Sequence, residues 1–271
     1  MNIYNSKQYF TYTFILTALF WVIGAYFSFE PNNQFYMVFL LLGLIVPFVM
    51  ALIFIYKGKN GTLKKEFITK FTNFQDIDKK TLPYFLFLMP FSVVLSILIS
   101  LLFGESSQQF TLSQNFSFST GTIPVLLLLL MAATFEELGW RGYGFESLEQ
   151  KHNFFYASLL FSILWSAWHI PLSFVNNSYQ YVVFQESIFH GINFYLSIIP
   201  LGFIISWIWV KNARNIPMAI AFHYIINLSQ EMFEITQTTK MIQTIVLTII
   251  AILIIYNEQE LFFNKRVSNE K

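Results

Sequence analysis

Long hydrophobic stretches, separated by short polar segments, dominate this chain of 271 residues. A helix needs about 20 apolar residues to cross the roughly 30 Å hydrocarbon core of a bilayer. By that criterion the pattern predicts eight membrane-spanning helices, at residues 10–29, 35–56, 82–103, 123–143, 154–175, 187–210, 216–233 and 241–256. We find no internal repeat, and we therefore predict one domain, 1–271, with the all-α fold of a polytopic membrane helix bundle.

Composition supports the membrane assignment and excludes several classes of function. Hydrophobic residues make up 55% of the chain and charged residues only 11%, whereas soluble domains carry about 25% charged residues. The net charge of +1 gives no basic field for nucleic acid. The absence of cysteine excludes disulfides, thiolate zinc sites and a cysteine nucleophile. Any chemistry must therefore come from the few polar residues at membrane depth.

The distribution of positive charge predicts the sidedness of the bundle. With the N-terminus inside, every one of the 16 lysines and arginines except Lys240 falls in an inner segment. The positive-inside rule then predicts that both termini are cytoplasmic and that the number of spans is even. The lysines between residues 57 and 80 are expected to lie in a solvated cytoplasmic loop, with contact to anionic lipid as the alternative.

The fourth predicted span ends in a group of ionisable residues, which are costly inside a membrane and usually functional. Glu137 and Arg141 are four residues apart, so they share one helix face and are expected to neutralise each other. Glu136 lies about 100° round the helix and has no cation in its own helix. It therefore requires a water, a metal or a partner on another helix, unless all three residues form one structural ion-pair network.

Two further spans contribute polar residues at a similar depth. His169 follows Trp165 by one helical turn, and His223 precedes Asn227 by one turn. Histidine and asparagine also join helices in membrane bundles by hydrogen bonds, so neither pair is diagnostic in isolation. Together with Glu136 they lie near the middle of the predicted spans. We expect the carboxylate, the two imidazoles and the amide to share one buried polar cavity.

These motifs resemble those of the CPBP family of intramembrane proteases, which includes bacterial Abi-type proteins and CAAX-prenyl endopeptidases of the Rce type. The family's first motif, two glutamates followed after three residues by arginine and glycine, matches residues 136–142. Its second motif, an aromatic residue four positions before histidine, matches Trp165 and His169. Its third motif, a histidine four positions before asparagine or a similar residue, matches His223 and Asn227. The sequence departs from the pattern at Trp165, where phenylalanine is usual.

The resemblance implies hydrolysis of peptide bonds within the membrane, by a protease core at about residues 123–233. Glu136 would be the base that activates water, and His169 would help to hold the water. His223 and Asn227 would stabilise the oxyanion of the tetrahedral intermediate. Structural support is implied for Glu137, Arg141 and Trp165.

A competing account makes Glu136, His169 and His223 the ligands of a divalent metal such as zinc, with water in the open position. The sequence favours metal-free activation of water, because a carboxylate partner for each histidine is not evident.

By analogy with the bacterial members, we expect an integral protein of a bacterial cytoplasmic membrane that acts on a small peptide or a membrane protein. The expected partners are therefore that substrate and the lipid bilayer, without nucleic acid, and the sequence leaves the oligomeric state open. The alternative function is a non-catalytic bacteriocin-immunity or scaffold protein that binds a peptide or partner protein in the same cavity.

Overall fold

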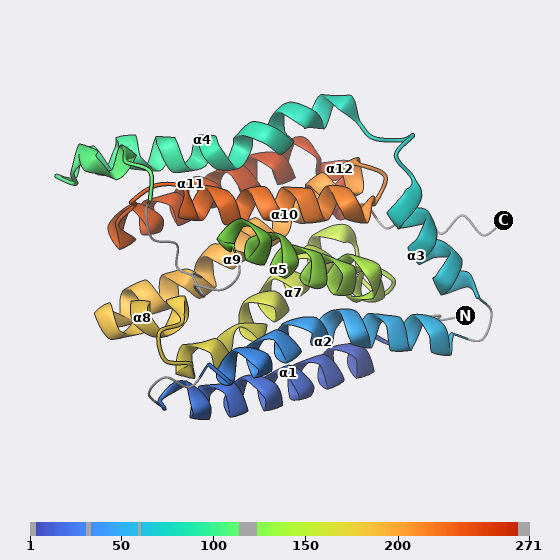
Figure 1. The fold of residues 1–271 in the computed structure, drawn as a ribbon. Coiled ribbons are helices and arrows are strands. Elements are labelled where there is room, and N and C mark those ends of the chain that lie inside the picture. Colours follow the sequence, from blue (N-terminus) through green and yellow to red (C-terminus); the bar gives the residue numbers. More distant parts are fainter. Residues whose placement is uncertain (1–3, 31–33, 59–60, 114–123, 265–271) are drawn as a thin grey trace.

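The computed structural model describes residues 4–30, 34–58, 61–113 and 124–264 and shows an all-α bundle (Figure 1). Helices α1 and α2 form one side of the bundle, and α4 and α11 form the opposite side, with α5, α7, α9 and α10 between them (Figure 1). The α-helices are α1 (Ser6–Ser28), α2 (Tyr36–Lys57), α3 (Thr62–Thr72), α4 (Leu82–Leu101), α5 (Val125–Gly139), α6 (Phe145–Glu149), α7 (Phe154–Trp168), α8 (Tyr179–Glu186), α9 (Ile188–Lys211), α10 (Ile216–Glu231), α11 (Gln237–Asn257) and α12 (Gln259–Phe263). The predicted all-α membrane bundle is thereby confirmed.

The predicted count of eight spans is not confirmed. Within the described residues, six helical segments are long and apolar enough to cross a membrane: α1, α2, α4, α7 with the turn that follows it, α9 and α11. The other two predicted spans correspond to α5 and α10, which have 15 and 16 residues, although residue 123 lies outside the described part. At 1.5 Å per residue α10 is about 24 Å long, shorter than the hydrocarbon core, whereas α5 alone is about 23 Å but continues without a break into the helical segments that follow it.

The two short helices pack between longer ones. α5 packs between α2 and α10, and α10 also contacts α4 and α9. The start of α1 and the short α12 lie at the same end of the bundle (Figure 1), as an even number of crossings requires. The orientation of that end toward the cytoplasm stays a prediction.

A widened turn continues α5 into α6. The segment η3 (Trp140–Gly144) is π-helical, and the N–H of Phe145 bonds to the carbonyl of Trp140 five residues earlier. π-Helical turns are rare and occur mostly at functional sites. Glycine allows neighbouring helices to approach this turn closely, because a Cβ at Gly142 would lie 2.9 Å from the ring of Phe67 on α3.

The helix α7 ends earlier than predicted. The span 154–175 was expected to be one helix, but α7 stops at Trp168 and the 3₁₀ turn η4 (Ile170–Phe174) follows. Pro171 explains the break, because it has no N–H to donate to the carbonyl of Ala167 one turn earlier. His169 consequently lies at the junction between the two segments, as the C-terminal cap of α7.

Proline inside α2 helps to join α1 to α2. Pro47 cannot donate a hydrogen bond to the carbonyl of Gly43, and Thr17 Oγ1 of α1 donates to that oxygen instead, at 3.2 Å. The hydroxyl of Tyr9 donates to the carbonyl of Pro47 itself at 3.1 Å. Pro47 thus leaves a backbone carbonyl of α2 free to accept a hydrogen bond from α1.

The lysine-rich segment between α2 and α4 is only partly solvated. Its helix α3 lies across one end of the bundle (Figure 1). Lys64 and Lys65 are exposed, but Lys70 is buried, with Nζ 2.9 Å from Glu66 Oε1 and 3.0 Å from Glu146 Oε1. The expectation of a solvated loop is therefore wrong for Lys70, which ties α3 to α6. Contact between the exposed lysines and anionic lipid stays a prediction.

A half-buried arginine fixes the loop between α9 and α10 to α6. Arg214 has a left-handed backbone conformation (φ 57°), and its guanidinium donates to both carboxylate oxygens of Glu149 at 2.7 and 2.8 Å and to Glu146 at 3.1 Å. Burial alone would lower the pKa of Arg214, but the two carboxylates raise it above its ordinary value. The charged group thus holds the start of α10 against α6.

The crossing of α5 and α2 depends on a missing side chain. A Cβ at Gly139 would lie 2.5 Å from the carbonyl carbon of Pro47 and 2.8 Å from the amide nitrogen of Phe48. Because these are backbone atoms, we expect Gly139→Ala to lower the free energy of unfolding by about 1–3 kcal/mol through overpacking. A lower thermal unfolding temperature of the purified protein in detergent measures this effect.

The matched control is Gly24→Ala, in α1 on the face toward α2. Its Cβ would meet the nearest atoms at 3.3 and 3.4 Å, so the neighbours need to move only slightly. Both substitutions remove the same backbone freedom of a helical glycine. Equal unfolding temperatures for the two variants would contradict the close α2–α5 crossing.

Candidate active site

Three helices bring most of the polar residues of the motifs into the middle of the bundle. Glu136 and Glu137 lie in the last turn of α5, His223 lies in the middle of α10, and His169 caps α7. The side chains of Glu136 and His223 are 5% and 3% exposed, and Glu137 is fully buried. Buried ionisable groups of this kind require partners, and the structure shows which ones each group has.

Trp165 of α7 contacts the other three groups of the candidate site. Its indole Nε1–H donates to Glu136 Oε2 at 2.7 Å. Its backbone carbonyl lies 2.8 Å from His169 Nδ1, and its ring meets the His223 ring edge-on, with centroids 5.3 Å apart. Glu136, His169 and His223 are therefore all gathered round one tryptophan.

Glu137 has two cationic or potentially cationic neighbours. Oε1 lies 2.9 Å from His223 Nδ1 on α10, and Oε2 lies 3.2 Å from Arg141 Nε in its own helix. The structure thus contains the Glu137–Arg141 pair that the helical spacing predicts. It adds a histidine partner from another helix that the spacing could not reveal.

Aromatic rings surround Arg141, which is fully buried. Its guanidinium carbon lies 4.3 Å from the ring centroid of Phe161, 5.4 Å from that of Phe145 and 5.8 Å from that of Trp209. None of its three nitrogens has a hydrogen-bond partner within the described residues. The contact to Glu137 is therefore an ion pair without hydrogen-bond alignment, and cation–π contacts supply the other stabilisation.

The tautomer of His169 follows from its partner. A backbone carbonyl can only accept a hydrogen bond, so Nδ1 of His169 carries a proton and donates it to Trp165. In the neutral ring, Nε2 is then an acceptor. The ring packs against Trp168 and Phe194, with centroid distances of 4.9 and 5.7 Å, which restricts its rotation.

Asn227 is placed less directly. It lies one helical turn after His223 on α10 and is half-buried. The described residues give its side chain no hydrogen bond, so no contact ties it to Glu136, Trp165 or His169. Its role in the site stays a prediction.

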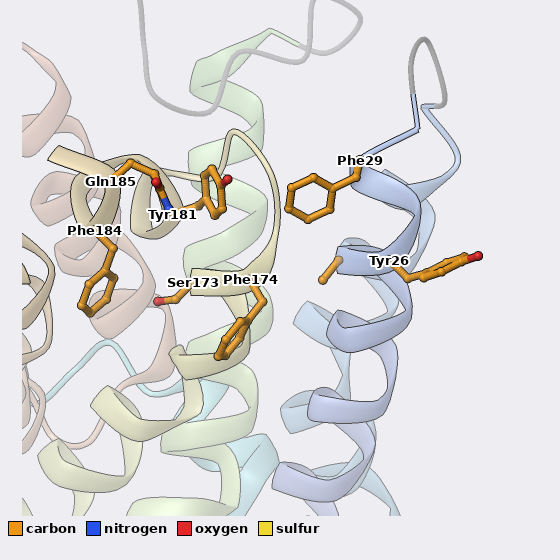
Figure 2. A pocket seen from close by; sticks show the side chains of 8 residues that line it. Tyr26, Phe29, Ser173, Phe174, Tyr181, Phe184 and Gln185 are labelled. Atoms are coloured by element: carbon orange, nitrogen blue, oxygen red, sulfur yellow. The ribbon is translucent and has the colours of Figure 1, made fainter.

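A hollow away from these residues has an apolar character. It has a volume of about 740 Å³ and lies between the end of α1 and the segments η4 and α8 (Figure 2). Tyr26, Phe29, Phe174 and Phe184 form much of its wall, and none of the motif residues lines it. Aromatic side chains of this kind are common where a membrane protein meets the lipid–water interface.

The metal hypothesis can be compared with the positions of its ligands. Within the described parts of the chain, no three His, Cys, Asp or Glu side chains form a group that could hold a metal ion. One oxygen of Glu136 already accepts the Trp165 N–H, at 2.7 Å. In the described structure Glu136, His169 and His223 therefore do not form such a group, and metal dependence stays a prediction.

Two features of the site were missed in the sequence. A carboxylate partner was not evident for either histidine, yet Glu137 binds His223. Trp165 was expected only to wall the cavity, yet it donates a hydrogen bond to Glu136. The available signal for the second feature was the tryptophan itself, which has an N–H where phenylalanine has none.

Comparison with known proteins identifies the family. The sequence model described as Type II CAAX prenyl endopeptidase Rce1-like matches residues 118–229, which include every motif residue from Glu136 to Asn227. The chain is also 52% identical over 263 residues to the CAAX prenyl protease 2 of Methanococcus maripaludis, and the alignment covers 97% of each chain. Together with the apolar helices, this similarity shows an integral membrane protein. The chain belongs to the Rce1-like family of type II CAAX prenyl endopeptidases, which are membrane endopeptidases.

Proposed function

We propose that the chain hydrolyses peptide bonds within the membrane with water that Glu136 activates. The observation that carries this proposal is the contrast between two adjacent carboxylates. Glu137 has His223 and Arg141 as neighbours, whereas the hydrogen bond to the Glu136 side chain within the described residues reaches Oε2 alone. Oε1 of Glu136 is thus left to accept a proton from water.

The geometry of His169 supports a role beside Glu136. With its Nδ1–H donated to the Trp165 carbonyl, Nε2 can accept a hydrogen bond from the water. The water oxygen would attack the carbonyl carbon of the peptide while Glu136 takes one proton. Glu136 would then return this proton to the leaving nitrogen as the carbon–nitrogen bond breaks.

His223 and Asn227 are proposed to stabilise the oxyanion. Donation from His223 requires a proton on Nε2 while Nδ1–H is bound by Glu137, which means an imidazolium paired with that carboxylate. Asn227, one turn further along α10, would add an amide N–H. Donors fixed before the reaction stabilise a developing oxyanion without reorganisation.

The substrate class follows from the similarity to a CAAX prenyl protease. A CAAX tail carries its prenyl group on cysteine, and the prenyl chain would keep the peptide at the membrane near the buried site. We therefore propose that the substrate is a prenylated peptide or protein with a CAAX-type C-terminus, within the broader class of peptides and membrane proteins. This activity distinguishes the chain from a non-catalytic immunity or scaffold protein.

We expect Glu136→Gln to abolish peptide hydrolysis, because the amide keeps the shape of the side chain but cannot accept a proton as a base. The expected loss is about 10²–10⁴-fold, the usual contribution of general base catalysis. Cleavage of a prenylated CAAX peptide by the protein in detergent measures it. Hydrolysis at the wild-type rate by a correctly folded Glu136→Gln protein would contradict Glu136 as the base, whereas a binding protein predicts no hydrolysis by the wild-type protein.

Two controls accompany this measurement. Glu186→Gln changes an exposed carboxylate of α8, which lies 3.5 Å from His190 Nδ1, and should leave the rate unchanged. A metal ligand at Glu136 would also give an inactive variant, so the wild-type protein is assayed after dialysis against a chelator. An unchanged rate supports direct activation of water by Glu136, and a lost rate that zinc restores contradicts it.

A prenyl group on the substrate is expected to raise kcat/KM by at least about tenfold, because burial of each CH₂ contributes about 0.8 kcal/mol. The comparison uses one CAAX peptide with and without a farnesyl group on its cysteine, and mass spectrometry of the released fragments. Equal kcat/KM values for the two peptides would show that the enzyme does not recognise prenylation.

Arg141 is expected to stabilise the fold rather than to touch the substrate. Replacing it leaves the buried Glu137 with His223 as its remaining partner. We therefore expect Arg141→Met to cost about 3 kcal/mol of unfolding free energy, at the lower end of the range for a broken buried ion pair. The thermal unfolding temperature in detergent reports this loss.

The double variant Arg141→Met with Glu137→Gln tests the cause of that loss. If an uncompensated carboxylate is responsible, the double variant should regain part of the unfolding temperature. Full stability of Arg141→Met together with complete loss of activity would instead place Arg141 in contact with the substrate.

A further inference from the structure

We propose that Trp165 positions the Glu136 carboxylate through its indole N–H, and that it thereby selects Oε1 as the oxygen that takes the proton from water. This inference rests on the proposed role of Glu136 as the base. It assigns to Trp165 a function that an aromatic wall alone would not have.

The hydrogen bond has the properties that positioning requires. The distance from Trp165 Nε1 to Glu136 Oε2 is 2.7 Å, which is in the short range typical of a donor to a charged carboxylate. Both side chains are buried, with Trp165 4% and Glu136 5% exposed. Bulk water therefore competes little for the carboxylate, and the direction of the indole N–H determines how the carboxylate lies.

The indole ring is itself held in place. It stacks on Phe161 with a centroid distance of 5.8 Å and an interplanar angle of 21°. On another side it meets His223 edge-on, at 5.3 Å and 80°. Rotation of the ring would break both contacts, so the N–H direction is fixed by packing within α7 and against α10.

Trp165 also positions His169, the second group proposed to contact the attacking water. Its backbone carbonyl accepts the Nδ1–H of His169 at 2.8 Å, while its side chain holds Glu136. One residue of α7 therefore determines the separation between the base and the histidine that would assist it. A change in the indole alone leaves the carbonyl contact in place, which allows the two roles to be tested separately.

The selection of one oxygen follows from these contacts. Oε2 of Glu136 accepts the indole N–H, so its basic lone pair is partly engaged, and Oε1 remains for the water. In the reaction, Oε1 would accept the proton of the attacking water and later donate it to the leaving amine nitrogen. Trp165 neither gains nor loses a proton, and is a positioning residue.

The decisive variant is Trp165→Phe, which keeps an aromatic ring but removes the N–H together with part of the indole ring. We expect kcat for a prenylated CAAX peptide to fall by about 10- to 100-fold, the range that corresponds to a hydrogen bond to a charged group. KM should stay within about twofold, because the indole N–H contacts the base and not the substrate. A purely structural role predicts a loss of folded protein without this separation of kcat from KM.

Trp21→Phe is the matched control. The indole of Trp21 is also buried and donates a hydrogen bond, at 2.9 Å to the carbonyl of Leu40, but it joins α1 to α2. Its loss should leave kcat unchanged. Wild-type kcat in Trp165→Phe, with Glu136→Gln inactive, would overturn the positioning role and leave the proposed function intact. Activity in Glu136→Gln would overturn the proposed function itself.

A spectroscopic measurement tests the contact without activity. The chain has six tryptophans, and the indole N–H signal that disappears from the ¹H–¹⁵N NMR spectrum of Trp165→Phe identifies Trp165. In Glu136→Leu, which removes the acceptor, this proton signal should move upfield while that of Trp21 stays in place. An unchanged Trp165 signal would contradict the hydrogen bond, whatever the activity of Trp165→Phe.

Discussion

The need to keep charge inside an apolar bundle governs the rest of this structure. Two adjacent carboxylates, Glu136 and Glu137, lie in the last turn of α5 with almost no exposure. An unpaired buried charge is far too costly to persist, so the fold must supply partners from other helices. It does so unequally. Glu137 is matched by His223 and Arg141, and Glu136 has one indole donor. This asymmetry is the basis of the different roles that we propose for the two neighbouring acids.

Breaks in regular helical structure provide the geometry for this arrangement. The π-helical turn η3 carries Arg141 just after the carboxylates. Pro171 ends α7, so that His169 lies at a helix terminus. The short helices α5 and α10 carry the remaining groups in the interior of the bundle. Regular spans of full length would pack more uniformly, but they would offer fewer freed backbone and side-chain groups at this depth.

The sequence predicts interactions along one helix better than interactions between helices. The Glu137–Arg141 pair follows from the i, i+4 spacing, and the structure contains it at 3.2 Å. The contacts of Glu137 with His223 and of Glu136 with Trp165 depend on how α5, α7 and α10 are aligned. That alignment depends on close packing, such as Gly139 against Pro47, which no periodicity in the sequence encodes.

The predicted spans and the observed helices differ for a similar reason. A hydropathy window counts apolar residues and does not detect that α10 has only 16 residues. The end of α7 could have been predicted from the sequence, because Pro171 cannot continue the helix. The apolar residues after Pro171 instead extended the predicted span to residue 175. For Lys70 the charge of the side chain led to the prediction that it is solvated. The structure buries it instead, because it forms ion pairs with Glu66 and Glu146.

Burial of charge also links the stability of this enzyme to its activity. The same Glu137 that compensates Arg141 fixes the ring of His223, so a group that stabilises the fold also orients the proposed oxyanion donor. Trp165 likewise packs against Phe161 while it holds Glu136. Membrane helices gain little from hydrophobic association with each other, because lipid is equally apolar. Polar contacts between helices therefore help to hold the bundle together, and some of them, such as Glu137 with His223, belong to the proposed site.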